Sequence, residues 1–197
     1  MKLHLGCGKL YLNNYINVDL LSEIADLKLD CRDLSVINND KIDEIYISHT
    51  LEHFKRHELL KVLLEWNRVL KNEGILRICV PDFEKVVARY IKNGDLSEIL
   101  GLVNGGQIDD LDIHYTVFDI TTLTEILEIC GFKDVNRYDT FNFLNEDQDD
   151  YSKCHLPHMD FTDGELMSLN ILCIKEKNVL YSELNLSDKI KKFVKFS

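Results

Sequence analysis

The hydrophobic pattern alternates between short apolar runs and longer amphipathic segments, which is typical of strands that alternate with helices. Apolar runs predict strands over 3–5, 24–29, 42–47, 75–80, 132–138 and 169–175, and 17–19 is the end of another strand. Apolar residues at steps of three and four predict helices over 51–70, 83–91, 96–103 and 121–130, whereas 10–15 is too short for one. We expect Thr121 or Thr122 to cap the last helix and Gly131 to end it. The pattern predicts an α/β fold of three layers with a mostly parallel sheet.

The first apolar run stops at a Gly-x-Gly turn. Gly6 and Gly8 bracket Cys7, and glycines at this point leave no Cβ between the backbone and a ligand. The next strand ends at Asp19, where doubly wound folds bind ribose hydroxyls. A dinucleotide fingerprint would need a third glycine at position 11, where this chain has Tyr11. The turn therefore favours a nucleoside without phosphates, and S-adenosylmethionine fits.

Four blocks of sequence resemble class I S-adenosylmethionine-dependent methyltransferases, in particular small members of the methyltransferase type 11 kind. The blocks are 4–8 with 16–19, 48–53, 68–74 and 75–82, within a resemblance that covers roughly 1 to 138. The resemblance implies a Rossmann-like αβα sandwich whose seven-stranded sheet has the order 3-2-1-4-5-7-6, with strand 7 antiparallel. The chain departs from the family at His4, where an acid is common, and at Lys9-Leu10, where the third glycine is replaced.

The resemblance also implies S-adenosylmethionine as cofactor and a set of cofactor-binding residues. These are Gly6, Cys7, Gly8, Asp19, Leu20, Asp30, Cys31, Ser48, His49 and His53. Asp19 would accept ribose hydroxyls, Asp30 and the Cys31 amide would contact adenine, and the chain at Ser48 and His49 would pass under the methionine portion. The plainer interpretation is a tight turn, solvated acids at strand ends and a structural His53.

Loops after the later strands would hold the methyl acceptor. We expect it to enter between the 105–114 loop and the acidic connection 139–168. Asp82 would then lie near the transferred methyl. His114 or His158 would be the base for a hydroxyl acceptor, because the unperturbed histidine pKa of about 6.5 suits proton removal near neutrality. Alternatively, both histidines face solvent.

No metal site is predicted. His49, His53 and His57 are spaced by four, but no acid or cysteine shares that spacing. Ligand-type residues also gather at 154–160, where Pro157 disrupts regular spacing and no second cluster completes a site. Six scattered cysteines without a Cys-x-x-Cys pair favour reduced thiols in a cytoplasmic protein.

Length and charge set further limits. The 197 residues suffice for one domain, which we expect over 1–177, followed by a basic amphipathic tail over 178–197. A formal net charge of −11 argues against a general nucleic-acid binder. No apolar run approaches the roughly 20 residues that span a bilayer, and the immediate first strand leaves no room for a signal peptide. The tail would either pack as a terminal helix or dock on a partner or membrane surface.

Together these features predict an enzyme, an S-adenosylmethionine-dependent methyltransferase that acts on a small-molecule acceptor such as a sugar or another hydroxylated metabolite. Two alternatives remain open at this point. One is a non-catalytic subunit that binds S-adenosylmethionine, and the other is a nicotinamide-dependent sugar enzyme on a similar sheet. The missing third glycine argues against the second alternative.

Overall fold

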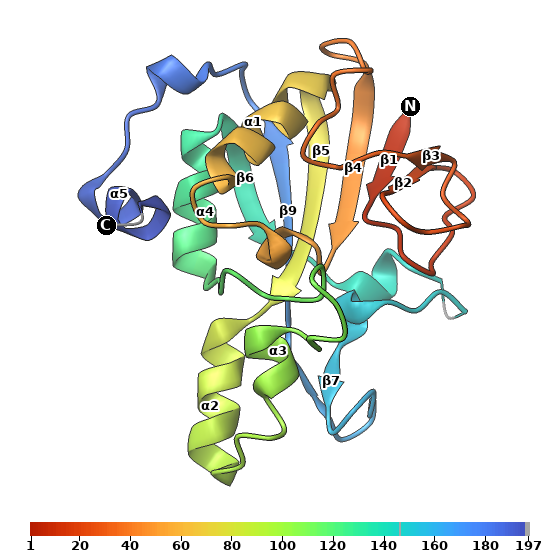
Figure 1. Cartoon of the computed structure of the whole chain (residues 1–197), viewed down its shortest axis with the longest axis vertical. Helices are drawn as coiled ribbons and strands as arrows, with labels where there is room; N and C mark the ends of the chain where they lie inside the picture. The colour runs from red at the N-terminus through yellow and green to blue at the C-terminus, as the bar shows by residue number, and fades with distance from the viewer. Residues whose placement is uncertain (146, 196–197) are drawn as a thin grey trace.

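The computed structural model describes residues 1–145 and 147–195, which form layers around a seven-stranded sheet (Figure 1). The strands are β1 (Lys2–Leu5), β2 (Ile16–Asp19), β3 (Leu27–Lys28), β4 (Ile42–Ser48), β5 (Leu70–Pro81), β6 (Phe132–Arg137) and β9 (Ser168–Lys175). Their order is β3-β2-β1-β4-β5-β9-β6. The pairs from β3 to β5 are parallel, and β9 is antiparallel to both of its neighbours. Since β9 is the last strand of this sheet, the predicted order 3-2-1-4-5-7-6 with an antiparallel strand 7 is confirmed.

The two faces of the sheet are covered by different kinds of segment. One face packs against α1 (Leu59–Val69), α4 (Ile120–Ile129) and α5 (Asp188–Val194) in the main hydrophobic core. The other face carries Tyr46 and Cys79, which pack with Leu12 and Leu144 from irregular segments. Side chains alternate between the faces along a strand, so Ile45 and Ile47 enter the main core whereas Tyr46 does not. α2 (Phe83–Asn93) and α3 (Leu100–Asn104) lie beyond the end of β5 (Figure 1).

The predicted helix over 51–70 is wrong in its first part. A 3₁₀ turn, Leu51–His53, is followed by an extended Phe54, and α1 begins at Leu59. Hydrogen bonds from a distant loop stabilise this interruption of the helix. The amides of Tyr115 and Thr116 donate to the Glu52 carbonyl, and the Thr116 hydroxyl donates to the Phe54 carbonyl at 3.0 Å. These tertiary hydrogen bonds replace the helical ones. His57 is consequently exposed and does not share a helix face with His49 and His53.

Several element boundaries differ from the prediction. The strand predicted over 24–29 shortens to β3, an exposed two-residue edge strand. The helix predicted over 96–103 shortens to α3, Leu100–Asn104. α4 is capped by Asp119, whose side chain accepts from the Thr122 amide at 2.6 Å, and Gly131 ends it with φ +88°. β5 begins at Leu70, directly after α1, and Glu73 within it has a positive φ of 61°.

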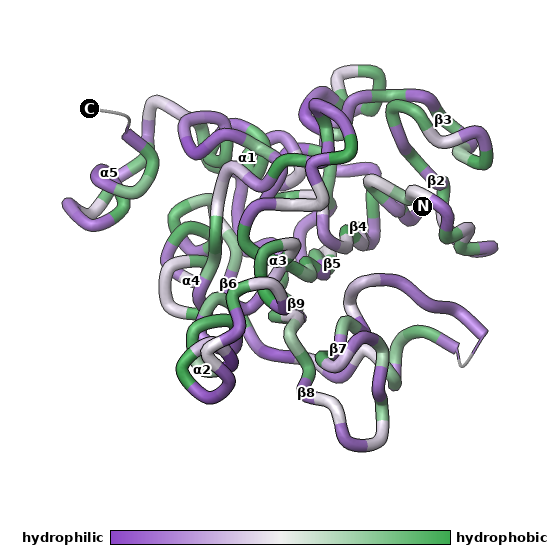
Figure 2. Tube along the Cα trace, turned by 60° about the horizontal axis from the view of Figure 1, so that its bottom comes forward, coloured by the Kyte–Doolittle hydropathy of each residue, from purple (hydrophilic) through white to green (hydrophobic). Residues whose placement is uncertain are grey.

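The connection 139–168 contains short elements of its own. They are the 3₁₀ turns Thr140–Asn142 and Tyr151–Lys153 and a hairpin of β7 (His155–Leu156) with β8 (Glu165–Leu166). Figure 2 shows a hydrophilic run in this connection, which includes 147–150. In Figure 1 the connection lies at the end of the sheet to which the arrows of β4 and β5 point. It therefore faces the strand ends where ligands bind in such folds.

The C-terminal tail packs on the domain. After a 3₁₀ turn at Tyr181–Glu183, α5 places Ile190 and Val194 in the main core, and the Phe193 ring lies 6.2 Å from that of Phe118. The apolar face of α5 is thus turned toward its own domain. Phe196 and Ser197 at the end of the predicted tail lie outside the described residues. Within 1–145 and 147–195, no helix combines the length and the apolar character that crossing a bilayer requires.

Candidate functional site

The Gly-x-Gly turn brings the end of β1 against the end of β4. Gly6 and Gly8 have φ +63° and +53°, a conformation that other residues rarely adopt. A Cβ atom on Gly6 would overlap the Thr50 side chain, two residues after β4, whereas one on Gly8 would meet nothing within 4 Å. Gly6 is therefore required by both conformation and space, which is the close approach that the sequence pattern indicated.

Two cavities open at this edge of the sheet and share residues Gly6 and His49. The smaller cavity has a volume of ≈ 430 Å³ and the larger one ≈ 520 Å³. Seven of the ten residues predicted to bind the cofactor line the smaller cavity: Gly6, Asp19, Leu20, Asp30, Cys31, His49 and His53. The remaining three, Cys7, Gly8 and Ser48, line the larger one, as do Gly6 and His49. The folded chain thus brings all ten predicted residues to one place.

The Asp19 carboxylate also organises the turn. Its Oδ2 accepts from the Gly8 amide at 2.9 Å, and its Oδ1 accepts from the amides of Leu21 and Ser22 at 2.8 Å each. A carboxylate has about four acceptor positions, and these three hydrogen bonds leave room for one more on Oδ2. Asp19 can therefore hold the glycine turn and still accept a hydroxyl from the smaller cavity.

The far end of the smaller cavity is formed around Asp30 and Cys31. Arg32 donates from Nε to both Asp30 oxygens at 3.0 Å and from Nη2 at 2.6 Å, which lowers the pKa of that carboxyl. The Cys31 carbonyl accepts from Trp66 Nε1 at 2.7 Å, which fixes the backbone at this point. Phe54 and Tyr115 add aromatic surface to the lining. The arrangement suits a flat, polar-edged ring better than a phosphate.

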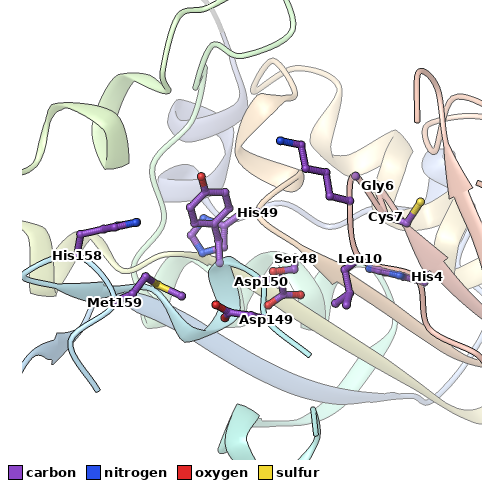
Figure 3. A pocket seen from close by; sticks show the side chains of 13 residues that line it. His4, Gly6, Cys7, Leu10, Ser48, His49, Asp149, Asp150, His158 and Met159 are labelled. Atoms are coloured by element: carbon purple, nitrogen blue, oxygen red, sulfur yellow. The ribbon is translucent and has the colours of Figure 1, made fainter. Parts of the chain in front are cut away.

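Polar and ring-bearing residues surround the larger cavity. Figure 3 shows His158 and Met159 on one side, His4, Gly6, Cys7 and Leu10 on the other, and Ser48, His49, Asp149 and Asp150 between them. The Tyr151 ring lies 5.5 Å from that of His49. The Asp150 carboxylate accepts from the Tyr46 hydroxyl at 2.6 Å, which anchors the 139–168 connection to β4.

A buried cluster lies directly behind His49. Glu52 is 0% exposed, and His49 Nδ1 and His114 Nε2 lie 3.3 and 3.9 Å from its Oε1. The His53 and His114 rings pack edge to face at 4.7 Å. Burial raises the pKa of Glu52 to about 8 and lowers that of His49 to about 3. The cluster contains two predicted site residues, His53 and His114, but also Glu52, which we did not predict.

Two of the three predicted catalytic residues lie away from the cavities. Asp82 is 0% exposed, caps α2 and accepts from Arg137 Nη1 at 3.0 Å, and among the described residues it lines neither cavity. His114 donates from Nδ1 to the Leu102 carbonyl at 3.0 Å and belongs to the buried cluster. Only the third residue, His158, lines the larger cavity. The position of Asp82 directly after a strand did not show whether it caps a helix or acts as an active-site acid.

Other residues of the site carried weaker signals in the sequence. Asp149, Asp150 and Tyr151 belong to an acidic stretch that we had described only as a connection. Glu52 follows the strand end at Ser48 by four residues, next to a histidine, within a segment predicted to be helical. Around His53 the metal analysis weighed the four-residue spacing of histidines and did not consider Glu52 or the distant His114.

Comparisons with known proteins agree with this geometry. Residues 3–78 match the family model of a methyltransferase domain. An S-adenosylmethionine-dependent methyltransferase from Archaeoglobus fulgidus aligns over 88% of this chain and 85% of its own, with 18% identity and a TM-score of 0.55. One from Thermotoga maritima, described as a possible histamine N-methyltransferase, aligns over 89% and 81%, with 15% identity and a TM-score of 0.56. No curated protein matches the sequence.

The smaller cavity can be tested against the cofactor that this domain implies. Acids outnumber bases in its lining, with Asp19, Asp30, Glu58 and Asp110 against Arg32 and Lys55. Carboxylates suit the hydroxyls and the amine of an adenosyl group, whereas pyrophosphate would require amide or cationic partners. The lining thus fits S-adenosylmethionine. Residues 3–78 thus match a methyltransferase domain, and the chain has the fold of S-adenosylmethionine-dependent methyltransferases.

Proposed function

We propose that this methyltransferase acts on a small polar acceptor that carries a hydroxyl group, such as a sugar or another hydroxylated metabolite. The observation that carries the proposal is that the two cavities meet at Gly6 and His49. One cavity matches the predicted adenosyl side, and the other extends from the same junction and has its own polar lining. A methyl donor and its acceptor require such an arrangement.

In this proposal the smaller cavity holds the adenosyl group. Asp19 accepts a ribose hydroxyl, Leu20 covers the sugar, and Asp30 with the Cys31 amide meets the adenine. The Gly6–Gly8 turn and the backbone at Ser48 and His49 hold the methionine portion. His53 contributes a ring edge to the wall. The cofactor, when bound, supplies an electrophilic methyl group on a sulfonium.

The larger cavity holds the acceptor. Its residues must keep the acceptor atom about 3–3.5 Å from the transferred carbon, the near-attack distance. Asp149 and Asp150 offer carboxylate oxygens that accept hydrogen bonds from hydroxyl groups and disfavour an anionic acceptor. His158 is the residue that we assign as base, because it lines this cavity. We do not retain Asp82 or His114 in this role.

The proposal is tested in two steps. Calorimetric titration with S-adenosylhomocysteine and with NAD should show binding of the adenosyl ligand alone. A panel of hydroxylated and amine acceptors is then assayed by release of S-adenosylhomocysteine. Turnover of hydroxylated acceptors supports the proposal. Turnover confined to amines would contradict the assigned acceptor class, and binding of NAD without response to the adenosyl ligand would contradict the cofactor assignment.

A further inference from the structure

Glu52 and His114, in the buried cluster behind His49, have no role in the proposed methyl transfer. Glu52 Oε1 and Oε2 and His53 Nδ1 are buried side-chain atoms with no hydrogen-bond partner among the described residues. An unpaired buried carboxylate is costly, and most buried polar atoms in folded proteins are hydrogen-bonded. Glu52 is fully enclosed, and the imidazole rings of His49, His53 and His114 are its neighbours. These buried atoms therefore need a partner that the described residues do not supply.

The hydrogen bonds of His114 fix where its proton lies. Its Nδ1 is 3.0 Å from the Leu102 carbonyl oxygen, which can only accept, so Nδ1 carries the hydrogen. In the neutral ring, Nε2 then holds a lone pair. This nitrogen is the one that faces Glu52 Oε1 at 3.9 Å.

The same argument applies to His49 through a longer chain. The Asn170 side-chain amide donates to the Ser152 carbonyl, so its oxygen accepts from the Ser168 hydroxyl at 2.8 Å. Because the Ser168 hydroxyl donates its single proton to Asn170, its oxygen accepts a hydrogen bond from His49 Nε2, which lies 3.0 Å away. His49 Nδ1 is then the lone-pair nitrogen, and it faces Glu52 Oε1 at 3.3 Å.

Lone pairs from several side chains therefore point toward one place. The ligand atoms of Glu52, His53 and His114 all lie within 4.8 Å of one another. Atoms that share a tetrahedral Zn²⁺ ion at about 2.1 Å lie about 3.4 Å apart, so side-chain movements on the order of 1 Å would close the site. A proton on Glu52 could satisfy one neighbouring nitrogen, whereas a cation would satisfy all of them.

We propose that Glu52, His53 and His114 form a binding site for one divalent transition-metal cation, with His49 beside it. Two imidazoles and a carboxylate suit ions such as Zn²⁺, Co²⁺ or Fe²⁺ better than Mg²⁺ or Ca²⁺, which prefer oxygen ligands. The Leu102 carbonyl would orient His114 from behind, as the outer partners of metal-ligating histidines do. The site does not depend on the acceptor class proposed above.

The position of this site gives the ion a role at the junction. His49 and His53 both line the smaller cavity, and His49 also lines the larger one. A cation held behind them would fix the wall that the two cavities share.

The site is tested by binding of the metal alone. Protein freed of metal with a chelator is titrated with Co²⁺ and with Zn²⁺, and the Co²⁺ complex is followed by its visible spectrum. We expect one ion per chain, without the charge-transfer band of thiolate ligands. Glu52→Gln, His53→Gln and His114→Gln should each weaken binding roughly a hundredfold or more, at or above the typical loss for an outer-shell partner. His57→Gln, a nearby exposed histidine, should bind as the wild type does.

Thermal melting separates loss of the site from loss of the fold. Wild-type protein and His57→Gln should melt at a higher temperature with Zn²⁺ than with chelator, because a ligand of the native state stabilises it. Glu52→Gln should fold without metal, since the amide has nearly the shape of the buried carboxyl that it replaces, and its melting should not respond to Zn²⁺. Absence of stoichiometric binding to the wild type, or binding of equal strength in all three ligand variants, would overturn the proposal.

Discussion

Arg137 Nη1 donates a hydrogen bond to Asp82 Oδ2 at 3.0 Å, and this contact ties β6 to the start of α2. The other carboxylate oxygen of Asp82 accepts from the Glu84 amide at 3.2 Å, as an N-cap does. A carboxylate engaged on both sides and enclosed by protein is positioned to hold two elements together. It is not positioned to meet an acceptor.

Asp82→Ala should therefore lower stability and leave chemistry intact. We expect a loss of about 1–3 kcal/mol in the free energy of unfolding, because a helix cap and a charge-assisted hydrogen bond disappear together. Urea denaturation measures this loss. Asp82→Asn is the matched control, since it keeps a side-chain oxygen for the cap, and its kcat should equal that of the wild type. A large fall in kcat in a well-folded Asp82→Asn protein would return Asp82 to the active site.

Gly6→Ala should cost more than Gly8→Ala, although both positions have positive φ. Each alanine carries a conformational cost of about 1–3 kcal/mol, but only the Cβ on Gly6 would overlap Thr50. The difference in unfolding free energy between the two variants reports that overlap. Thr50→Ala should partly rescue Gly6→Ala and should have no such effect on Gly8→Ala. Equal costs for the two glycine variants would mean that close approach to β4 is unimportant.

Asp19→Ala should weaken binding of S-adenosylhomocysteine by roughly 1–3 kcal/mol, the usual cost of losing charge-assisted hydrogen bonds. Because Asp19 also accepts from three backbone amides, this variant should lose some stability too. Calorimetric titration measures the affinity and thermal melting the stability. Glu23→Gln removes an exposed acid nearby and should bind the ligand normally. Unchanged affinity in folded Asp19→Ala would exclude Asp19 as the ribose acceptor.

His158→Ala should reduce kcat roughly a hundredfold or more with a hydroxyl acceptor, the typical contribution of a general base. The affinity for S-adenosylhomocysteine should stay unchanged, because His158 lines the larger cavity and does not line the smaller one. Steady-state kinetics with the best acceptor of the panel checks this, with His57→Ala as the matched control. If His158→Ala turns over at the wild-type rate, another group or water takes the proton.

The cysteine thiols should react slowly in the native protein. Burial raises the pKa of Cys31 and Cys130 to about 12 and that of Cys154 to about 11, and it also raises the pKa of Cys7, Cys79 and Cys173. At pH 8 a thiol with a pKa of about 12 is only about one part in ten thousand thiolate, the reactive form. An aromatic disulfide reagent should therefore label the six thiols rapidly only in denaturant.

One thiol provides an internal check on the cofactor site. Cys7 lines the larger cavity beside the glycine turn. Any native labelling should occur there first, and bound S-adenosylhomocysteine should suppress it. Rapid labelling of Cys130 or Cys173 in the native state would instead show that the core opens readily.

The sheet could be predicted to a large extent from the sequence. The apolar runs that became β1, β4, β5 and β9 are local patterns, and the burial of most of their side chains leaves little choice of structure for them. Order and direction came from resemblance, since pattern alone does not pair strands. Helix boundaries were predicted less well, because caps such as Asp119 compete with equally good neighbours such as Thr121 and Thr122.

The predicted helix over 51–70 failed for a reason outside its own sequence. Its apolar spacing is helical, but the amides of Tyr115 and Thr116 bind the carbonyl of Glu52. Hydrogen bonds from a distant loop removed the helical ones, and the turn that resulted points Glu52 into the protein. A local pattern contains no information about such a partner.

The sequence by itself determined the glycine turn and the acid at the end of β2, because backbone geometry imposes these features locally. The alternation of strands with helices predicted a mostly parallel sheet, whose strand ends converge on one edge. Only the tertiary structure decided which of the polar residues near that edge act together. Asp82 accepts a hydrogen bond from Arg137, and His158 lines the larger cavity. Glu52 lies beside His53 and His114. The physical reason is that a side chain's chemistry depends on what encloses it, and packing brings in those neighbours from distant parts of the chain.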